Sequence, residues 1–230
     1  MTRFVTVAEM ALREMLRRRS VLVILAALPL AFYLSRRGDH LGQSVRFVCL
    51  GLGWALSTAA LFAGSAAREI EPRLRLSGYR SHHLYVGRLA APWAVGVALA
   101  VPYFLLILVD QDSVRHGPVA LMMAIMVAVS APFGLALSAT LPRELEGTLV
   151  LLVVVGLQMM TDPGSTVARV LPFWFSREIG TYAIDGVDSG YLARGVLHGA
   201  VCAVVLLAGV GVASSRRLRQ RSHLTFVTPR

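Results

Sequence analysis

The sequence predicts an all-α integral membrane protein that crosses the bilayer six times. Of its 230 residues, 56% are apolar and only 16% are charged, and the mean hydropathy is +0.64. Ordinary soluble domains are about 45 to 50% apolar and about 25% charged. The charges are also segregated, because six long stretches contain no Asp, Glu or Arg. Composition therefore argues against both a soluble globular protein and a disordered chain.

The six uncharged stretches are expected to be the transmembrane helices of a single domain spanning residues 1–230. A helix needs about 17 to 25 apolar residues to cross roughly 30 Å of hydrocarbon. Four stretches reach that length, whereas the first and fifth are shorter and are expected to extend into their flanks or to lie in thinner bilayer. The six stretches are residues 20–35, 47–67, 89–109, 118–141, 147–161 and 196–215.

The first stretch has an alternative interpretation as the apolar part of a signal peptide, because it follows Arg17, Arg18 and Arg19. The segment before it is long for a signal peptide and contains Glu9 and Glu14. No small-x-small cleavage site follows the stretch. We therefore interpret it as a retained helix.

The arginine distribution predicts the orientation of the chain. The formal charge is +10, and all 23 Lys+Arg residues are Arg. With the N-terminus inside, 16 arginines fall on inner segments and seven on outer ones. The positive-inside rule favours this orientation, with both termini in the cytoplasm. The high pI is thus a topology signal, and no nucleic-acid partner is expected.

The missing lysine excludes two kinds of chemistry. A phosphate-binding P-loop and a Schiff-base enzyme both need a Lys side chain. The chain is therefore not expected to hydrolyse ATP through a P-loop of its own. Cys49 and Cys202 both lie in apolar stretches, so neither a disulfide framework nor a cysteine zinc site is expected.

Residues 1–18 have the pattern of an amphipathic interfacial helix. Phe4, Val7, Ala11 and Met15 recur at three- to four-residue spacing, and polar side chains fall opposite them. Such a helix lies in the membrane interface with its arginines near anionic lipid headgroups. It is either a simple anchor or a helix that also touches a cytoplasmic partner, and the segment alone favours neither alternative.

Residues 68–88 form the long cytoplasmic connection between the second and third stretches. Pro72 suits a first helical turn, and Ser77-Gly78 suits a turn that ends a helix. Apolar side chains among charges in such a connection favour contact with a protein surface. The alternative is a solvated charged face whose leucines dip into the interface. The side chains that would make a protein contact are Glu69, Glu71, Leu74, Leu76 and Tyr79.

Residues 162–195 form a long outer connection that is too apolar for free solvent. Pro172, Arg177 and Glu178 interrupt it too often for a further crossing. Its aromatic residues are typical of interfacial anchors. The alternative is one or two short re-entrant helices that form a gate, which the bilayer permits if they are buried in protein.

Little in the crossings predicts chemistry. His198 is the one ionisable side chain within the six stretches, and such a residue more often hydrogen-bonds a neighbouring helix than transfers protons. No serine has a Gly-x-Ser-x-Gly frame, and the adjacent His82 and His83 lack the spacing of a helical metal pair. No catalytic residue and no metal site are expected.

In their order along the chain, these parts resemble the ABC-2 (type V exporter) family of ABC-transporter permeases. That family has an amphipathic helix, six crossings, a coupling helix between the second and third, and short re-entrant helices before the sixth. The resemblance covers the whole chain in layout and is concentrated in residues 69–88. The chain departs from the family in having Pro72-Arg73 where Gly-Thr is common, and Ser77-Gly78 where a Pro often falls.

The resemblance implies a permease subunit of an exporter in the cytoplasmic membrane of a bacterium. It would pair with a second copy or a sister permease, and separate ATPase subunits would bind ATP and Mg²⁺, so this chain would hold no cofactor. Residues 68–88 would couple to the ATPase through the five side chains named above. The outer exit of the substrate path would lie near Gln158, Met159, Met160, Phe173 and Phe175.

Two other functions remain open from the sequence. One is a stand-alone intramembrane enzyme that uses His198, and the other is an assembly protein whose helices only hold a complex in the membrane. Activity without ATP or a partner would favour the enzyme, whereas ATP-dependent movement of a substrate would contradict the assembly protein.

Overall fold

The fold consists of α-helices throughout the part of the chain that the computed structural model describes, which is residues 3–37, 41–79, 81–162 and 164–219. No strand occurs in these ranges, so the all-α prediction is confirmed for them. The helices are α1 (Arg3–Arg17), α2 (Arg19–Leu34), α3 (Leu41–Leu76), α4 (Ser81–Asp110), α5 (His116–Thr140), α6 (Glu144–Met160), α7 (Thr166–Val170), α8 (Trp174–Asp185) and α9 (Ser189–Arg219).

Four of the helices are long and apolar enough to cross a membrane. Their apolar spans are Gly42–Arg68, His83–Asp110, His116–Thr140 and Ser189–Ser215. The chain therefore has the character of a membrane protein. The two stretches that were short in the sequence remain short as helices, with 16 residues in α2 and 17 in α6.

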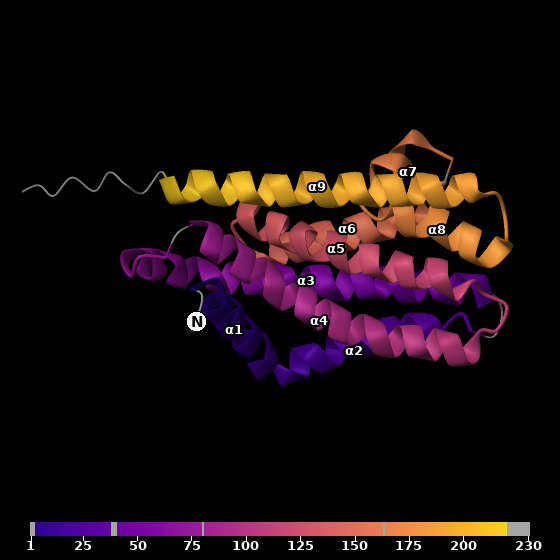
Figure 1. Ribbon diagram of the computed structural model, residues 1–230, viewed down its shortest axis with the longest axis horizontal. Helices are drawn as coiled ribbons and strands as arrows, with labels where there is room; N and C mark the ends of the chain where they lie inside the picture. The colour runs from indigo at the N-terminus through magenta and orange to yellow at the C-terminus, as the bar shows by residue number, and fades with distance from the viewer. Residues whose placement is uncertain (1–2, 38–40, 80, 163, 220–230) are drawn as a thin grey trace, which may run out of the picture.

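The long helices run side by side, with α3 in the interior and α9 along one flank (Figure 1). Within the most apolar 18 residues of α3, 72% of the residues are buried, against 11% in the most apolar 18 residues of α9. Helices α2, α4, α5, α6 and α8 all pack against α3. The helix α1 meets α2 at an angle and lies against α4, while α7 and α8 lie beside the first half of α9.

Helices α3 and α5 approach closely because small residues line both. Gly53, Ser57, Ala60 and Gly64 recur along α3, opposite Ser130, Gly134 and Ser138 of α5. A Cβ atom on Gly134 would collide with the backbone carbonyl of Ser57. The Ser57 hydroxyl donates to the backbone oxygen of Ser130 at 3.1 Å. Small residues at three- to four-residue spacing are the usual basis of close helix packing in membranes, where burial from water provides no driving force.

The apolar span of α3 ends at Arg68, close to the expected end of the second crossing at residue 67, but the helix itself does not end there. Helix α3 continues without interruption to Leu76, and its 36 residues extend about 54 Å at 1.5 Å per residue. Helix α4 begins at Ser81, so residues 68–88 form a helical hairpin rather than a separate coupling helix in a loop. The turn is as the sequence indicated: Gly78 has φ 83°, and the amide of Tyr79 donates to the carbonyl of Leu74 at 3.2 Å. This is a Schellman ending, which glycine favours because it lacks a Cβ.

The substitution Gly134→Ala tests the close packing of α3 and α5. It should lower the thermal unfolding midpoint in detergent, even though Ala is about 1 kcal/mol better than Gly in a helix. Overpacking typically costs about 1 to 3 kcal/mol. Gly156→Ala is the matched control, since a Cβ there meets nothing within 4 Å. Equal midpoints for the two variants would contradict the contact.

Candidate functional site

The tip of the α3–α4 hairpin exposes apolar side chains at a strongly charged end of the bundle. Leu76 is 90% exposed and Ile70 is 46% exposed, whereas Leu74 and Tyr79 are half-buried. Among the described residues, little packs against the Leu76 side chain. Leu76 and Ile70 thus leave apolar surface uncovered at this end within the described part of the chain.

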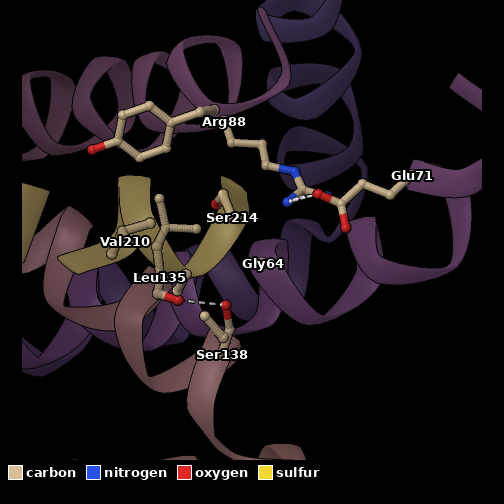
Figure 2. A pocket seen from close by; sticks show the side chains of 10 residues that line it. Gly64, Glu71, Arg88, Leu135, Ser138, Val210 and Ser214 are labelled. Atoms are coloured by element: carbon tan, nitrogen blue, oxygen red, sulfur yellow. Dashed lines mark hydrogen bonds and ion pairs between the residues drawn. The ribbon is translucent and has the colours of Figure 1, made fainter. Parts of the chain in front are cut away.

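A buried ion pair joins the two arms of the hairpin at its base. The Arg88 guanidinium of α4 lies 2.6 Å from the Glu71 carboxylate of α3, and their side chains are 16% and 5% exposed. Figure 2 shows both side chains reaching toward each other across the space between the two helices. Glu71 is thus turned into the chain rather than outward. The side chain of Glu69 lies outside the described part of the structure.

The base of the hairpin is also fastened to the neighbouring helices. Arg68 of α3 donates to the carbonyl of Leu141 at 2.7 Å and to that of Pro142 at 3.4 Å, just beyond the C-terminal end of α5. A cation at a helix C-terminus is favourable because the last carbonyls lack partners. The Tyr85 hydroxyl of α4 donates to the carbonyl of Leu207 in α9 at 2.6 Å.

The cavity beside the Glu71–Arg88 pair is small. Gly64, Leu135, Ser138 and Val210 are among the residues that line it, and its volume is about 20 Å³. That volume suits about one water molecule. The base of the hairpin is therefore a packed joint rather than a ligand pocket.

The amphipathic helix α1 is packed against the protein along much of its apolar face. Val7 and Met15 are buried, Ala11 is half-buried and Phe4 is 40% exposed. A Cβ added at Gly87 of α4 would collide with the Val7 side chain, so α1 and α4 touch closely there. Helix α1 is thus docked on the hairpin arm α4, and both alternatives for this segment, a simple anchor and a helix that also touches a cytoplasmic partner, stay predictions.

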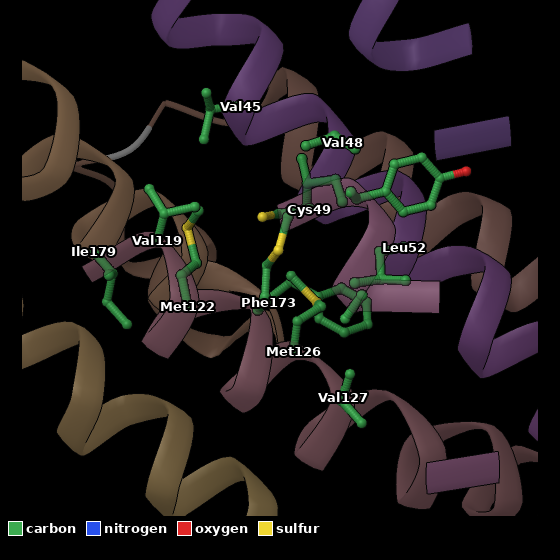
Figure 3. Close-up of a cluster of buried hydrophobic side chains, with 14 of the residues drawn as sticks. Val45, Val48, Cys49, Leu52, Val119, Met122, Met126, Val127, Phe173 and Ile179 are labelled. Carbon is green, nitrogen blue, oxygen red and sulfur yellow. The ribbon is translucent and has the colours of Figure 1, made fainter. Parts of the chain in front are cut away.

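The five residues expected at the outer exit do not form one surface. Phe173 and Phe175 are fully buried, with Phe173 edge-on to Phe133 at 5.7 Å between ring centroids. Figure 3 shows Phe173 among the apolar side chains of α3 and α5. At the end of α6, by contrast, Met159 and Met160 are exposed and Gln158 is half-buried.

The aromatic residues of the outer segment belong to short buried helices. Helix α8 packs against α3, α5 and α9, so the interpretation as interfacial anchors is wrong for Phe173 and Phe175. Their rings are large and apolar, and burial in protein satisfies them as well as the membrane interface does. Polar bonds hold α8 in place: Arg194 to Glu178 at 2.9 Å and Arg46 to Asp185 at 3.0 Å.

A polar cluster that sequence reasoning missed joins the ends of α2 and α4. The Arg37 guanidinium and the Tyr33 hydroxyl both donate to the Asp110 carboxylate, and the Gln111 amide donates to the Tyr33 hydroxyl at 3.0 Å. Hydrogen bonding to Asp110 raises the pKa of the Arg37 guanidinium. The sequence signal was two opposite charges, each at the end of an apolar stretch, but nothing in the sequence paired them.

His198 is engaged by its neighbours. Its Nε2 lies 2.9 Å from the backbone oxygen of Arg169 in α7, and its ring is edge-on to Trp174 at 5.1 Å between centroids. The expected hydrogen bond to a neighbouring element is confirmed. Within the described residues, no three His, Cys, Asp or Glu side chains are placed to hold a metal ion.

No protein-family model and no curated protein matches this sequence.

The ion pair at the base of the hairpin can be tested with a double-mutant cycle. Glu71→Met leaves the Arg88 charge without its partner, and breaking a buried pair typically costs about 3 to 5 kcal/mol. We expect a large fall in the unfolding midpoint for Glu71→Met and for Arg88→Met. The double variant should recover most of the loss, because two methionines fill the site without a charge. Additive losses in the double variant would contradict the pairing.

Proposed function

We propose that this chain is the membrane-spanning permease subunit of an ATP-binding-cassette exporter, driven by a separate ATPase. The observation that carries the proposal is the α3–α4 hairpin, whose tip exposes Leu76 while its base is fastened to the bundle. An ATPase on another chain could bind this exposed apolar tip and move the hairpin as one rigid body. The absence of lysine from the sequence supports placing the P-loop on that other chain.

The proposal includes six crossings, with α2 and α6 added to the four long helices. The Arg37–Asp110 pair supports this for α2, because it joins the end of α2 to the end of α4. Helix α6 starts beside the end of α5, and the structure continues from it into α7 and α8 beside the first half of α9. At 16 and 17 residues these helices are about 24 and 26 Å long, a mismatch that local thinning accommodates at modest cost.

In this proposal the arginine-rich end faces the cytoplasm of a bacterium, and both termini lie there. The ATPase would bind ATP and Mg²⁺ and would contact Leu76, with Leu74 and Tyr79 beside it. Glu71 would act through Arg88 by setting the angle between α3 and α4, rather than by touching the ATPase. The role of Glu69 stays a prediction from the resemblance.

Movement of the hairpin would reach the substrate path through α3. Because α3 packs closely on α5, a tilt of the hairpin displaces both helices as one body. Helices α2 and α6 lean on α3 and present apolar faces outward, with Val23 and Ile24 each 67% exposed and Val153 58% exposed. A second copy or a sister permease would meet the chain near these faces, and substrate would leave between the two.

The outer end of that path would be lined by the end of α6. Gln158 is half-buried there, and its side-chain oxygen has no hydrogen-bond partner within the described structure. Met159 and Met160 are flexible and exposed, as suits an adaptable apolar surface. Phe173 and Phe175 would support this end from within the core instead of lining the path.

Leu76→Asp tests the coupling contact. A charge at a site that is 90% exposed in the free chain should leave folding intact and abolish co-purification with the ATPase of the native membrane. Val170→Asp is the matched control, because Val170 is 79% exposed on α7. The control should retain the ATPase and its stimulated ATP hydrolysis. If Leu76→Asp retains both, the hairpin is not the coupling element.

Cysteine labelling tests whether α2 and α6 cross the membrane. With Cys49 and Cys202 replaced by Ala, single cysteines are placed at Arg13, Ser77 and Asp188, which are all exposed. A membrane-impermeant maleimide on intact cells should label the cysteine at position 188 and spare those at positions 13 and 77. Labelling at position 13 would exclude a crossing by α2, and protection at position 188 would exclude one by α6.

A further inference from the structure

A wide groove lies beside α1, between it and the inner end of α3, and residues of α4 and α5 also line it. Its volume is about 1160 Å³, slightly more than the roughly 300 to 1,000 Å³ of typical ligand pockets. Its walls are mostly apolar and include Met10 of α1, Ala63, Ala66, Ile70 and Leu74 of α3, and Leu84 of α4.

The rim of this groove carries an excess of positive charge. Arg13, Arg17, Arg18 and Arg19 line it where α1 meets α2. Arg13 pairs with Glu9 at 2.5 Å and Arg18 with Glu14 at 3.5 Å. Within the described structure Arg17 and Arg19 have no carboxylate partner, and both are exposed. The groove therefore offers the guanidinium groups of Arg17 and Arg19 beside an apolar wall, and the acidic Glu144 also belongs to its lining.

A narrow apolar cleft continues from the groove between α2 and α3. Leu22, Leu25 and Phe62 line it, and it shares Ala63, Ala66, Glu14 and Arg18 with the groove. The cleft leads from the arginines along α2, in the direction of the helix's apolar length. Its open volume is only about 30 Å³, so an extended hydrocarbon chain would lie across the apolar mouth of the cleft rather than inside it.

We propose that this groove binds one anionic phospholipid of the surrounding leaflet, with the phosphate on Arg17 and Arg19 and an acyl chain along the cleft. Charge and shape together select this occupant. A soluble anion would leave the apolar cleft empty, and an uncharged lipid would leave the arginines without a partner. The C-terminal residues 220–230 are a poor occupant, because they carry Arg221 and Arg230 and no acidic residue. The inference does not depend on the exporter function.

Lipid retention by the full-length chain tests the proposal. The protein is purified in a neutral detergent, mixed with phosphatidylglycerol and phosphatidylcholine of identical acyl chains, and analysed by native mass spectrometry. One phosphatidylglycerol should be retained in preference to phosphatidylcholine. The double variant Arg17→Gln, Arg19→Gln should retain at least about tenfold less phosphatidylglycerol, since each arginine near a lipid surface contributes about 1 kcal/mol.

The matched control is the double variant Arg73→Gln, Arg143→Gln, which removes the same charge from two exposed arginines outside the groove. It should retain phosphatidylglycerol as the unmodified chain does. Unchanged retention in the Arg17, Arg19 variant would overturn the proposal and favour a protein segment as the occupant of the groove. An equal loss in the control would also overturn it and would favour diffuse attraction between the charges.

Deacylated phosphatidylglycerol separates a lipid site from a simple anion site. Because it has the headgroup without the chains, it should fail to displace the retained lipid at equal concentration. Displacement by this soluble compound would show that the phosphate alone is bound and would overturn the part played by the cleft. The thermal unfolding midpoints of both double variants are measured as well. Because all four arginines are exposed, the substitutions are expected to leave these midpoints unchanged.

Discussion

The close contact of α3 with α5 is the constraint on which the rest of the structure depends. Two helices in a membrane gain little from excluding water, so they associate through packing and hydrogen bonds, and both require backbones that come near each other. Gly134 and Gly64 permit that approach, and Ser57 adds a hydrogen bond across it. Since α2, α4, α6 and α8 all pack on α3, a shift of this interface would displace the contacts that these four helices make with it.

Polar contacts near the two ends of the bundle complement the contact between the small residues of α3 and α5 in its middle. At one end Glu71 and Arg88 close the base of the hairpin, and at the other Asp110 holds Tyr33 and Arg37. Glu71 lies beyond the apolar span of α3, which ends at Arg68. The Asp110 cluster joins residues far apart in the sequence and lies at the ends of α2 and α4, where charges avoid the cost of the hydrocarbon interior. The result is a bundle with polar contacts at both ends, from which the hairpin tip projects with Leu76 exposed.

Much of this fold follows from composition alone. Long uncharged stretches predict long apolar helices, and the four longest have the length to cross a membrane. The extension of α3 to Leu76 was missed because charges after residue 67 mark the edge of the hydrocarbon, which a helix can pass without breaking. Ser77-Gly78 marks the true end. The partners of Glu71, Asp110 and Phe173 could not be predicted, because each contact depends on which helices become neighbours. The sequence did indicate that this connection carries apolar side chains among charges, and one of them, Leu76, is exposed at the tip.

The central claim is that the hairpin moves as a rigid lever when a separate ATPase binds ATP. The most direct measurement is the distance between spin labels on Ser77 of two copies, in the reconstituted complex of permease and ATPase. Ser77 is exposed at the hairpin turn, so the label should not disturb the packing. The account predicts that this distance changes when ATP is trapped on the ATPase and returns when nucleotide is removed. An unchanged distance, in a complex that hydrolyses ATP, would contradict it.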